Sequence, residues 1–315
     1  MFDFTYLFDG PLISVDAFPQ LDGNINGPSL IRCPEWITAP PAKYLLYFAH
    51  HEGRSIRLAL SDHLAGPWRL HHPAPMLLAD SHFAQEPAEL AALDAQARSF
   101  IDKGEDGNYP HIASPDVWVD HERREIRLYY HGRLDNGLQR TRVAVSKNGL
   151  NFGAREEILA TPYLRLFKQD DWYYALTMPA QLYRSRDGLS GFEQGPRLTD
   201  EPIRHHALLR HQQRWYLFWT RVGDQPERIL VSSLQTNTDW KHWRLGSPHE
   251  VHRARQYWEG ADRPVSASNY GAIMQRVNQL RDPAIYQEDG RIYLLYAIAG
   301  EQGIAIGELS KVRSE

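Results

Sequence analysis

Three carboxylic acids in this chain stand in settings suited to proton transfer: Asp116, Glu259 and Asp282. Asp116 follows a Ser-Pro pair, Glu259 stands between Trp and Gly, and Asp282 stands between Arg and Pro. Cleavage of a glycosidic bond needs one protonated carboxyl and one ionised carboxylate across that bond. If these three acids converge in space, they are the ones best placed to meet that need.

Imidazole and guanidinium groups accompany the acids along the chain. An imidazole titrates near neutral pH, so it can transfer a proton to or from a substrate. Arg165, Arg204 and Arg281 could grip a phosphate or a sugar carboxylate. The residues predicted to contact a substrate are Asn26, His50, His51, His111, His131, Arg165, His205, His206 and Arg281.

A recurring strand pattern must position these side chains. Its best copy, residues 281–296, reads as a strand, a tight turn at Glu288-Asp289-Gly290 and a second strand of apolar and aromatic residues. Looser copies, also built of short strand-like runs separated by Gly, Pro and charged turns, span residues 27–70, 114–152, 163–192 and 205–243. Recurrence of one supersecondary unit predicts a repeat architecture.

Four-stranded units that occur five times predict an all-β, five-bladed β-propeller. The fifth copy has only three strands, so a strand within residues 6–13 is expected to supply the fourth and close the ring. Closure of this kind leaves no long exposed sheet edge. We expect residues 1–315 to form one domain, because no linker or low-complexity segment divides them. The inner strand of each blade begins near the central channel, which would bring the candidate residues together, with Asn24, Tyr163 and Arg204 beside them.

Two insertions interrupt the repeat, at residues 71–110 and 248–279, where loops of a propeller shape its pocket. The first contains residues 88–98, a run of strong helix formers that predicts a helix. Asp224 and Glu227 lie in a polar stretch with Gly and Pro, which favours a hairpin turn over a pocket role.

The motifs Tyr44-Leu-Leu-Tyr-Phe-Ala-His-His51, Gly66-Pro-Trp68, Ser114-Pro-Asp-Val117, Trp258-Glu-Gly260 and Arg281-Asp-Pro283 resemble those of the five-bladed propeller glycoside hydrolases of families 43, 32, 68 and 117. The resemblance covers nearly the whole chain at the level of blades. It implies a glycosidase that cleaves an oligosaccharide in an axial pocket with inversion. It also implies that Glu259 is the general acid, that Asp116 is the base or tunes it, and that Asp282, with Arg281, holds the sugar.

One segment departs from those families. Their first inner strand usually offers an Asp as base or nucleophile, whereas this chain has Asn24-Ile-Asn-Gly-Pro28 there, with Asp22 just outside. An amide cannot accept a proton at neutral pH. The base is therefore Asp22, Asp116 or Asp282, or the chemistry differs. A histidine acts as an acid in family 117, which makes His111, His205 and His206 candidates here.

Two alternatives to a glycosidase remain open at this point. A carbohydrate-binding propeller without catalysis would explain Asn26 in place of an acid. A sugar lyase or phosphorylase would keep the pocket and use His or Arg differently. No His or Cys spacing indicates a metal, so no cofactor is expected, although a divalent metal in the central channel is a further alternative.

Composition narrows the range of partners and compartments. The formal net charge of −4 gives no electrostatic reason to expect nucleic acid or a membrane surface as a partner. The single cysteine, Cys33, excludes an internal disulfide and lies in an apolar strand pattern that predicts a core position. The first residues show no signal-peptide pattern, and no apolar run is long enough to span a bilayer, so a cytoplasmic location is expected.

Overall fold

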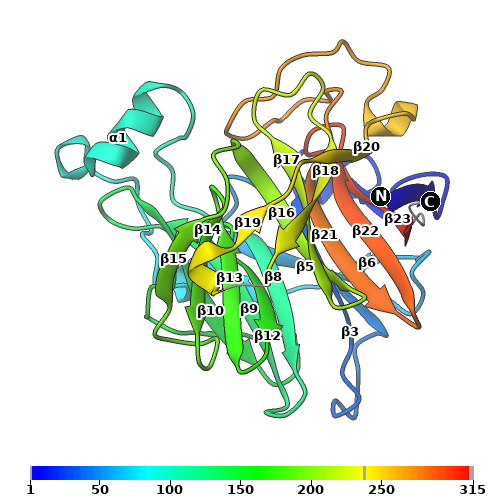
Figure 1. Ribbon diagram of the computed structural model, residues 1–315, viewed down its shortest axis with the longest axis horizontal. Helices are drawn as coiled ribbons and strands as arrows, with labels where there is room; N and C mark the ends of the chain where they lie inside the picture. Colours follow the sequence, from blue (N-terminus) through cyan, green and yellow to red (C-terminus); the bar gives the residue numbers. More distant parts are fainter. Residues whose placement is uncertain (1, 237–238, 312–315) are drawn as a thin grey trace.

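The computed structural model describes residues 2–236 and 239–311, and it consists of five antiparallel sheets arranged around a central axis (Figure 1). This arrangement confirms the predicted all-β, five-bladed propeller. Within this described part, no helix combines the length and apolarity that would be needed to cross a membrane.

The first three blades follow one another in sequence. Blade one holds β3 (Asn26–Arg32), β4 (Tyr44–Ala49), β5 (Ser55–Ser61) and β6 (Arg69–Leu70), with β7 (Met76–Leu77) also paired to β5. Blade two holds β8 (Ile112–Asp120), β9 (Glu125–Arg133), β10 (Gln139–Ser146) and β11 (Gly153–Ala154). Blade three holds β12 (Arg165–Gln169), β13 (Trp172–Thr177), β14 (Gln181–Ser185) and β15 (Glu193–Arg197).

The last two blades complete the ring. Blade four holds β16 (Ile203–His211), β17 (Arg214–Arg221), β18 (Ile229–Gln235) and β19 (Arg244–Leu245), with β20 (His249–His252) also paired to β18. Blade five holds β21 (Arg281–Glu288), β22 (Arg291–Ile298), β23 (Gly303–Lys311) and the N-terminal β1 (Phe2–Tyr6).

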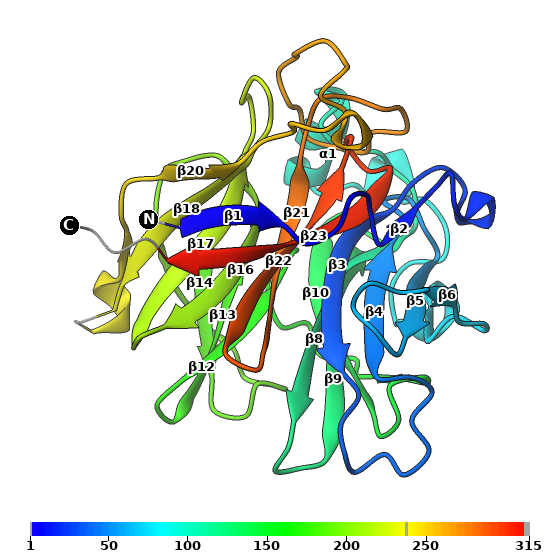
Figure 2. The same cartoon turned by 90° about the vertical axis from the view of Figure 1, so that its right-hand side faces the viewer.

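The ring is closed by the N-terminus, as predicted, although by different residues. Strand β1 pairs antiparallel with β23 from Phe2 opposite Lys311 to Tyr6 opposite Gly307, and Figure 2 shows the two strands side by side. A second short strand, β2 (Ile13–Ser14), pairs further along β23. The predicted strand at residues 6–13 is therefore wrong in its bounds. The chain bends between the two pieces at Gly10, whose φ of 133° lies outside the range that other residues readily adopt.

Helical structure is sparse and lies mainly in the insertions. The predicted helix at residues 88–98 is instead a 3₁₀ turn, Leu90–Ala92, followed by α1, Ala95–Asp102. The helix begins late because the carboxylate of Asp94 accepts a hydrogen bond from the backbone N–H of Gln96, which makes Asp94 its N-cap. The other 3₁₀ turns are Pro19–Leu21, Leu78–Asp80, Trp240–His242 and Tyr257–Glu259.

Apolar side chains pack between neighbouring blades rather than at one common centre. Leu45 and Ile56 of blade one, for example, pack in one cluster with Ile126 and Leu128 of blade two. Cys33 is a free, buried thiol in the same cluster, as predicted. The apolar face of each strand therefore holds the ring together, while the starts of the inner strands are free to carry polar groups.

Candidate functional site

The inner strands of three blades begin with the same backbone conformation, a left-handed residue followed by proline. Gly27, Ser114 and Asp282 each precede a proline, have φ of 59°, 52° and 48°, and lie where the register with the next strand shifts. A left-handed conformation costs a residue other than glycine about 1–3 kcal/mol. In blade three, Tyr163 has φ of 63° just before β12. These equivalent positions carry an acid only in blade five.

A cavity of about 200 Å³ opens at the end of the ring where the inner strands begin. Polar residues from the blades line it, among them His51, Ser114, His131, Tyr163, Arg204 and His205. Both insertions line it as well, with Phe100 and Tyr270 in edge-to-face contact at a ring separation of 6.3 Å. Figure 1 shows α1 and the loop after β20 on the same end of the ring. The pocket is therefore built by the blades and walled by the insertions.

Asp282 does not itself line this pocket but lies directly behind two residues that do, Tyr163 and His205, and it is 2% exposed. The hydroxyl of Tyr163 donates to its Oδ1 at 3.0 Å, and Nε2 of His205 lies 3.6 Å from the same oxygen. Its Oδ2 is buried without a hydrogen-bond partner among the described residues. Burial and the negative charge of Glu301 raise the pKa of Asp282 to about 6. This carboxyl can therefore carry a proton close to neutral pH.

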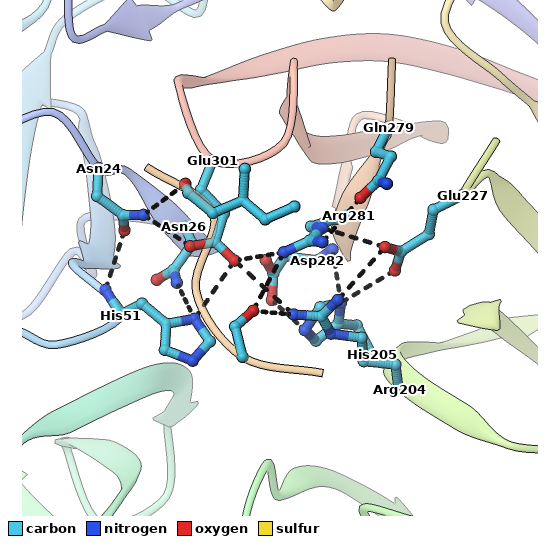
Figure 3. A network of polar contacts seen from close by, with 12 residues as sticks. Asn24, Asn26, His51, Arg204, His205, Glu227, Gln279, Arg281, Asp282 and Glu301 are labelled. Carbon is cyan, nitrogen blue, oxygen red and sulfur yellow. Dashed lines mark hydrogen bonds and ion pairs between the residues drawn. The ribbon is translucent and has the colours of Figure 1, made fainter. Parts of the chain in front are cut away.

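Beside Asp282, four fully buried charged groups of alternating sign form a ring (Figure 3). Arg281 lies 2.9 Å from Glu301 through Nη1 and 3.1 Å from Glu227 through Nε. Arg204 lies 3.4 Å from Glu227 and 4.0 Å from Glu301. Alternating charges offset the cost of removing each ion from water. Arg281, which was predicted to bind the sugar, thus forms ion pairs with two carboxylates and does not line the pocket.

Glu301 connects this ring to blade one. Its Oε2 accepts a hydrogen bond from Asn24 at 2.7 Å, and its Oε1 lies 3.3 Å from Nδ1 of His51. Burial opposes ionisation of Glu301, but His51 and the two arginines outweigh it and hold its pKa well below the usual range. Glu301 therefore stays negative, orients His51 at the pocket and acts on the titration of Asp282.

The predicted histidines divide between the pocket and its surroundings. His51, His131 and His205 line the pocket. His111 lies behind it with its ring 5.6 Å from that of His131, while His206 is fully buried and Nε2 contacts the carbonyl of Leu176 at 3.0 Å. Burial lowers the pKa of His131 and His205, so both are neutral and can donate or accept a hydrogen bond at a hydroxyl.

Four further predicted residues do not line the pocket. His50 accepts a hydrogen bond from the N–H of Glu52 in a tight turn, and Asn26 contacts His51 at 3.4 Å. Arg165 stacks on the ring of Tyr163 at 4.1 Å and lines a separate axial cavity of about 170 Å³. Asp116 lines that same cavity and accepts a hydrogen bond from the N–H of Leu166 at 2.8 Å. Burial raises the pKa of Asp116, but it lies apart from the pocket.

The structure places Glu259, the predicted general acid, away from the pocket and within a network of hydrogen bonds. Glu259 does not line the pocket and accepts hydrogen bonds from the hydroxyls of Tyr6 and Tyr296 at 2.7 and 2.8 Å. Nε2 of His252 lies 2.7 Å away, and two backbone N–H groups also donate. Burial would raise the pKa of Glu259, but these contacts outweigh it and lower the pKa. A carboxylate held in this way is stabilised in its ionised form and is therefore poorly suited to donate a proton.

The sequence predictions missed Glu301, placed Glu227 in a polar hairpin turn and overlooked Glu105, which lines the pocket. The strand order of each blade could have located Glu227 and Glu301, because antiparallel strands alternate in direction. If the inner strands begin at the pocket, the loops that join the second and third strands of each blade also lie at the pocket. His51, Glu227 and Glu301 occupy such loops in blades one, four and five.

The sequence left open a divalent metal in the central channel. Across residues 2–236 and 239–311, no group of three or more His, Cys, Asp or Glu side chains is arranged to hold a metal ion.

Comparison with known proteins finds one related sequence and several solved structures with a similar fold. No family model matches it. "Uncharacterized protein R118" of Acanthamoeba polyphaga mimivirus is 33% identical over 316 residues, which cover 92% of this chain and 85% of that protein. The chain belongs to the family of mimivirus R118. The propeller of this R118-family chain is also shared by solved structures of low sequence identity.

Three such structures show the fold. A thermostable family-43 glycoside hydrolase is 15% identical and covers 99% of this chain and 94% of its own, with a TM-score of 0.57. CoXyl43, a β-xylosidase/α-arabinofuranosidase from a compost metagenome in complex with xylotriose, is 13% identical and covers 98% and 96%, with a TM-score of 0.57. An α-L-arabinanase of Cellvibrio cellulosa in complex with arabinohexaose is 14% identical and covers 92% and 93%, with a TM-score of 0.54. The R118-family chain thus has the five-bladed propeller fold seen in family-43 enzymes.

Proposed function

We propose that this protein is a glycoside hydrolase that binds a carbohydrate in the axial pocket and cleaves a glycosidic bond there. The observation that carries the proposal is Asp282, a carboxyl in contact with the pocket residues Tyr163 and His205, with one oxygen unpartnered among the described residues and a pKa of about 6. The shared fold with carbohydrate-cleaving propellers supports it by analogy, since a fold alone does not fix a function.

Asp282 is the proton donor in this proposal. A glycosidase acid must be protonated near neutral pH, and enzymes achieve this by placing the carboxyl in a buried site or beside another negative charge. Asp282 has both features, because it is 2% exposed and Glu301 lies nearby as a permanent anion. This role differs from the sugar-holding role that the sequence predicted for Asp282.

Imidazoles and a phenol bind the sugar in this proposal. His51, His131 and His205 line the pocket together with Tyr163, and such groups pair with hydroxyls as donors and acceptors. A cavity of about 200 Å³ is smaller than the roughly 300–1,000 Å³ of sites for drug-sized ligands. We therefore propose that the pocket takes one sugar unit, at the end of an oligosaccharide.

The test is release of a chromogenic aglycone from a panel of aryl glycosides. The Asp282→Asn variant is expected to lower kcat by about 10²–10⁴-fold, the usual contribution of general acid catalysis. The matched control is Asp289→Asn, which changes an exposed acid with a similar backbone conformation (φ of 52°) in the hairpin of the same blade. If both variants retain wild-type rates, Asp282 is not the proton donor.

One observation favours a second candidate, a carbohydrate-binding propeller without catalysis. The positions equivalent to Asp282 in blades one and two are Gly27 and Ser114, neither of which can transfer a proton. Calorimetric titration with the same sugars separates the candidates. Binding of a sugar by wild type with no turnover of any glycoside would support the binding propeller and overturn the hydrolase.

A further inference from the structure

We propose that Glu105, which comes from the first insertion and not from a blade, is the second catalytic carboxylate of the pocket. This inference rests on the proposed hydrolase function, because cleavage by hydrolysis needs a base opposite the acid. Glu105 lines the pocket and is half-buried. It therefore lies where a base could reach a water molecule beside a bound sugar.

The other acidic groups around the pocket are already engaged. Glu301 and Glu227 are fully buried and face Arg281 and Arg204. Asp106 accepts hydrogen bonds from Arg133 at 2.8 Å and from Gln139 at 2.7 Å. A carboxylate held by buried arginines is a poor base, because its negative charge is already stabilised.

Glu105 differs from these acids. Its carboxylate forms no hydrogen bond or ion pair with any residue in the described part of the chain. Its side chain is therefore free to interact with a bound sugar or water.

The backbone that carries Glu105 is fixed by the end of α1. Gly104 adopts φ of 67°, its N–H donates to the carbonyl of Ile101, and the N–H of Glu105 donates to the carbonyl of Phe100, both at 2.9 Å. These two bonds around a left-handed glycine form a Schellman motif. Phe100 of the same motif contacts Tyr270 of the second insertion. The helix end therefore sets the direction in which the chain leaves α1 at Glu105.

The residue that follows anchors the loop on its other side. Asp106 pairs with Arg133, whose guanidinium is fully buried in blade two and also donates to the carbonyl of Gly137 at 2.5 Å. Glu105 thus stands between a capped helix end and a buried ion pair. Preorganisation of this kind is what a catalytic group requires to act without reorganising its surroundings.

The reaction balances with these two groups. Asp282 transfers its proton to the leaving oxygen as the bond from the anomeric carbon to that oxygen breaks. Water forms the new bond to the anomeric carbon and gives its proton to the carboxylate of Glu105. The products are the free sugar and the released alcohol, with the anomeric configuration inverted, and the proton returns from Glu105 to Asp282 through solvent.

The experiment measures kcat, KM and the pH profile of wild type, Glu105→Gln and the control Glu89→Gln, which alters an exposed acid of the same insertion. Loss of a general base is expected to lower kcat of Glu105→Gln by about 10²–10⁴-fold, with KM nearly unchanged and the acidic limb of the profile removed. The loss should be similar for good and poor aryl leaving groups, since the base does not assist departure. By contrast, Asp282→Asn should lose more activity on poor leaving groups.

The outcomes separate the two proposals. If wild type cleaves no glycoside, the hydrolase function itself fails. If wild type is active and Glu105→Gln stays within about twofold, in a reaction where general catalysis gives at least about 10²-fold, the role of Glu105 is refuted. Should Glu105→Gln unfold at a lower temperature, Glu105→Ala with added azide or formate decides the matter. Rescue by the small anion supports a base at this site, and absence of rescue in a folded variant overturns it.

Discussion

Two buried acids of this propeller, Asp282 and Glu259, show how differently a protein can treat a carboxyl that it removes from water. Glu259 accepts hydrogen bonds from two tyrosines and two backbone amides and pairs with His252. Asp282 has one firm hydrogen bond, from Tyr163, and one oxygen without a partner. The pKa of Glu259 is lowered and that of Asp282 is raised to about 6.

The difference teaches that burial alone does not make a reactive acid. A fully hydrogen-bonded carboxylate stabilises the fold and resists protonation. A carboxyl with unmet hydrogen bonds costs stability and remains available for chemistry. Both acids lie in short sequence motifs, Trp-Glu-Gly and Arg-Asp-Pro. In this chain the acid of the Trp-Glu-Gly motif is the one that stabilises the fold.

The largest expected effect on stability comes from removing Glu259. The Glu259→Ala variant should lose about 3–5 kcal/mol of unfolding free energy, because loss of one partner leaves other buried polar groups unpaired. Urea denaturation measures this loss. The control Glu308→Ala, a half-buried surface acid paired with Arg291, should lose about 0–1 kcal/mol. Equal losses in the two variants would contradict the structural role of Glu259.

A second effect is the pH dependence of stability. The pKa of Asp282 rises from 3.8 when exposed to about 6 in the fold, so the folded state binds more protons than the unfolded state between these values. Wild type should therefore lose stability relative to Asp282→Asn as pH rises from 4 to above 6, by on the order of 2 kcal/mol.

Glu259→Gln should show the opposite trend. Because folding lowers the pKa of Glu259 below 4.5, the advantage of wild type over this variant exists above that pH and disappears as pH falls through the folded-state value. Thermal unfolding across pH 3–8 (a range spanning both ordinary carboxyl values) measures both trends. Parallel stability curves for the two variants would show that the carboxyls do not differ.

The smallest effect concerns single hydroxyls. Tyr296→Phe removes a donor at 2.8 Å from the ionised Glu259 and should cost about 1.5 kcal/mol. Tyr163→Phe removes the donor to Asp282; it should cost less stability, because Tyr163 lines the pocket and water can replace it. It should instead raise the pH at which the acid titrates. The change in Tm of each variant measures these losses. A larger loss in Tyr163→Phe than in Tyr296→Phe would contradict the proposed difference between Asp282 and Glu259.

The repeat was predictable because each blade buries apolar faces, and burial leaves a period in the sequence. The same logic located the starts of the inner strands, where Asp282 and His205 lie. The closing strand was misplaced because β1, Phe2–Tyr6, gains its stability from pairing with β23, about three hundred residues away, and a local pattern cannot show such a partner.

The site was predicted less well for a different reason. Glu301 lies in a hairpin loop whose sequence, Gly-Glu-Gln-Gly, is typical of a solvated turn, yet it is fully buried by Arg281, His51 and Asn24. Its environment is supplied by three separate parts of the chain. The sequence also showed no sign that Glu259 is held in a network of hydrogen bonds, because its partners Tyr6 and Tyr296 are far from it in sequence.

The pairing of β1 with β23 has a consequence for how the protein comes into being. Blade five needs both the first strand of the chain, β1, and its last, β23. Until β23 has been synthesised, the growing chain therefore has an unpaired sheet edge at each end. Contacts of such long sequence separation form slowly, and an unpaired edge invites association with other chains. Tyr6 extends this coupling to Glu259, so the ring can close only after β23 has been synthesised.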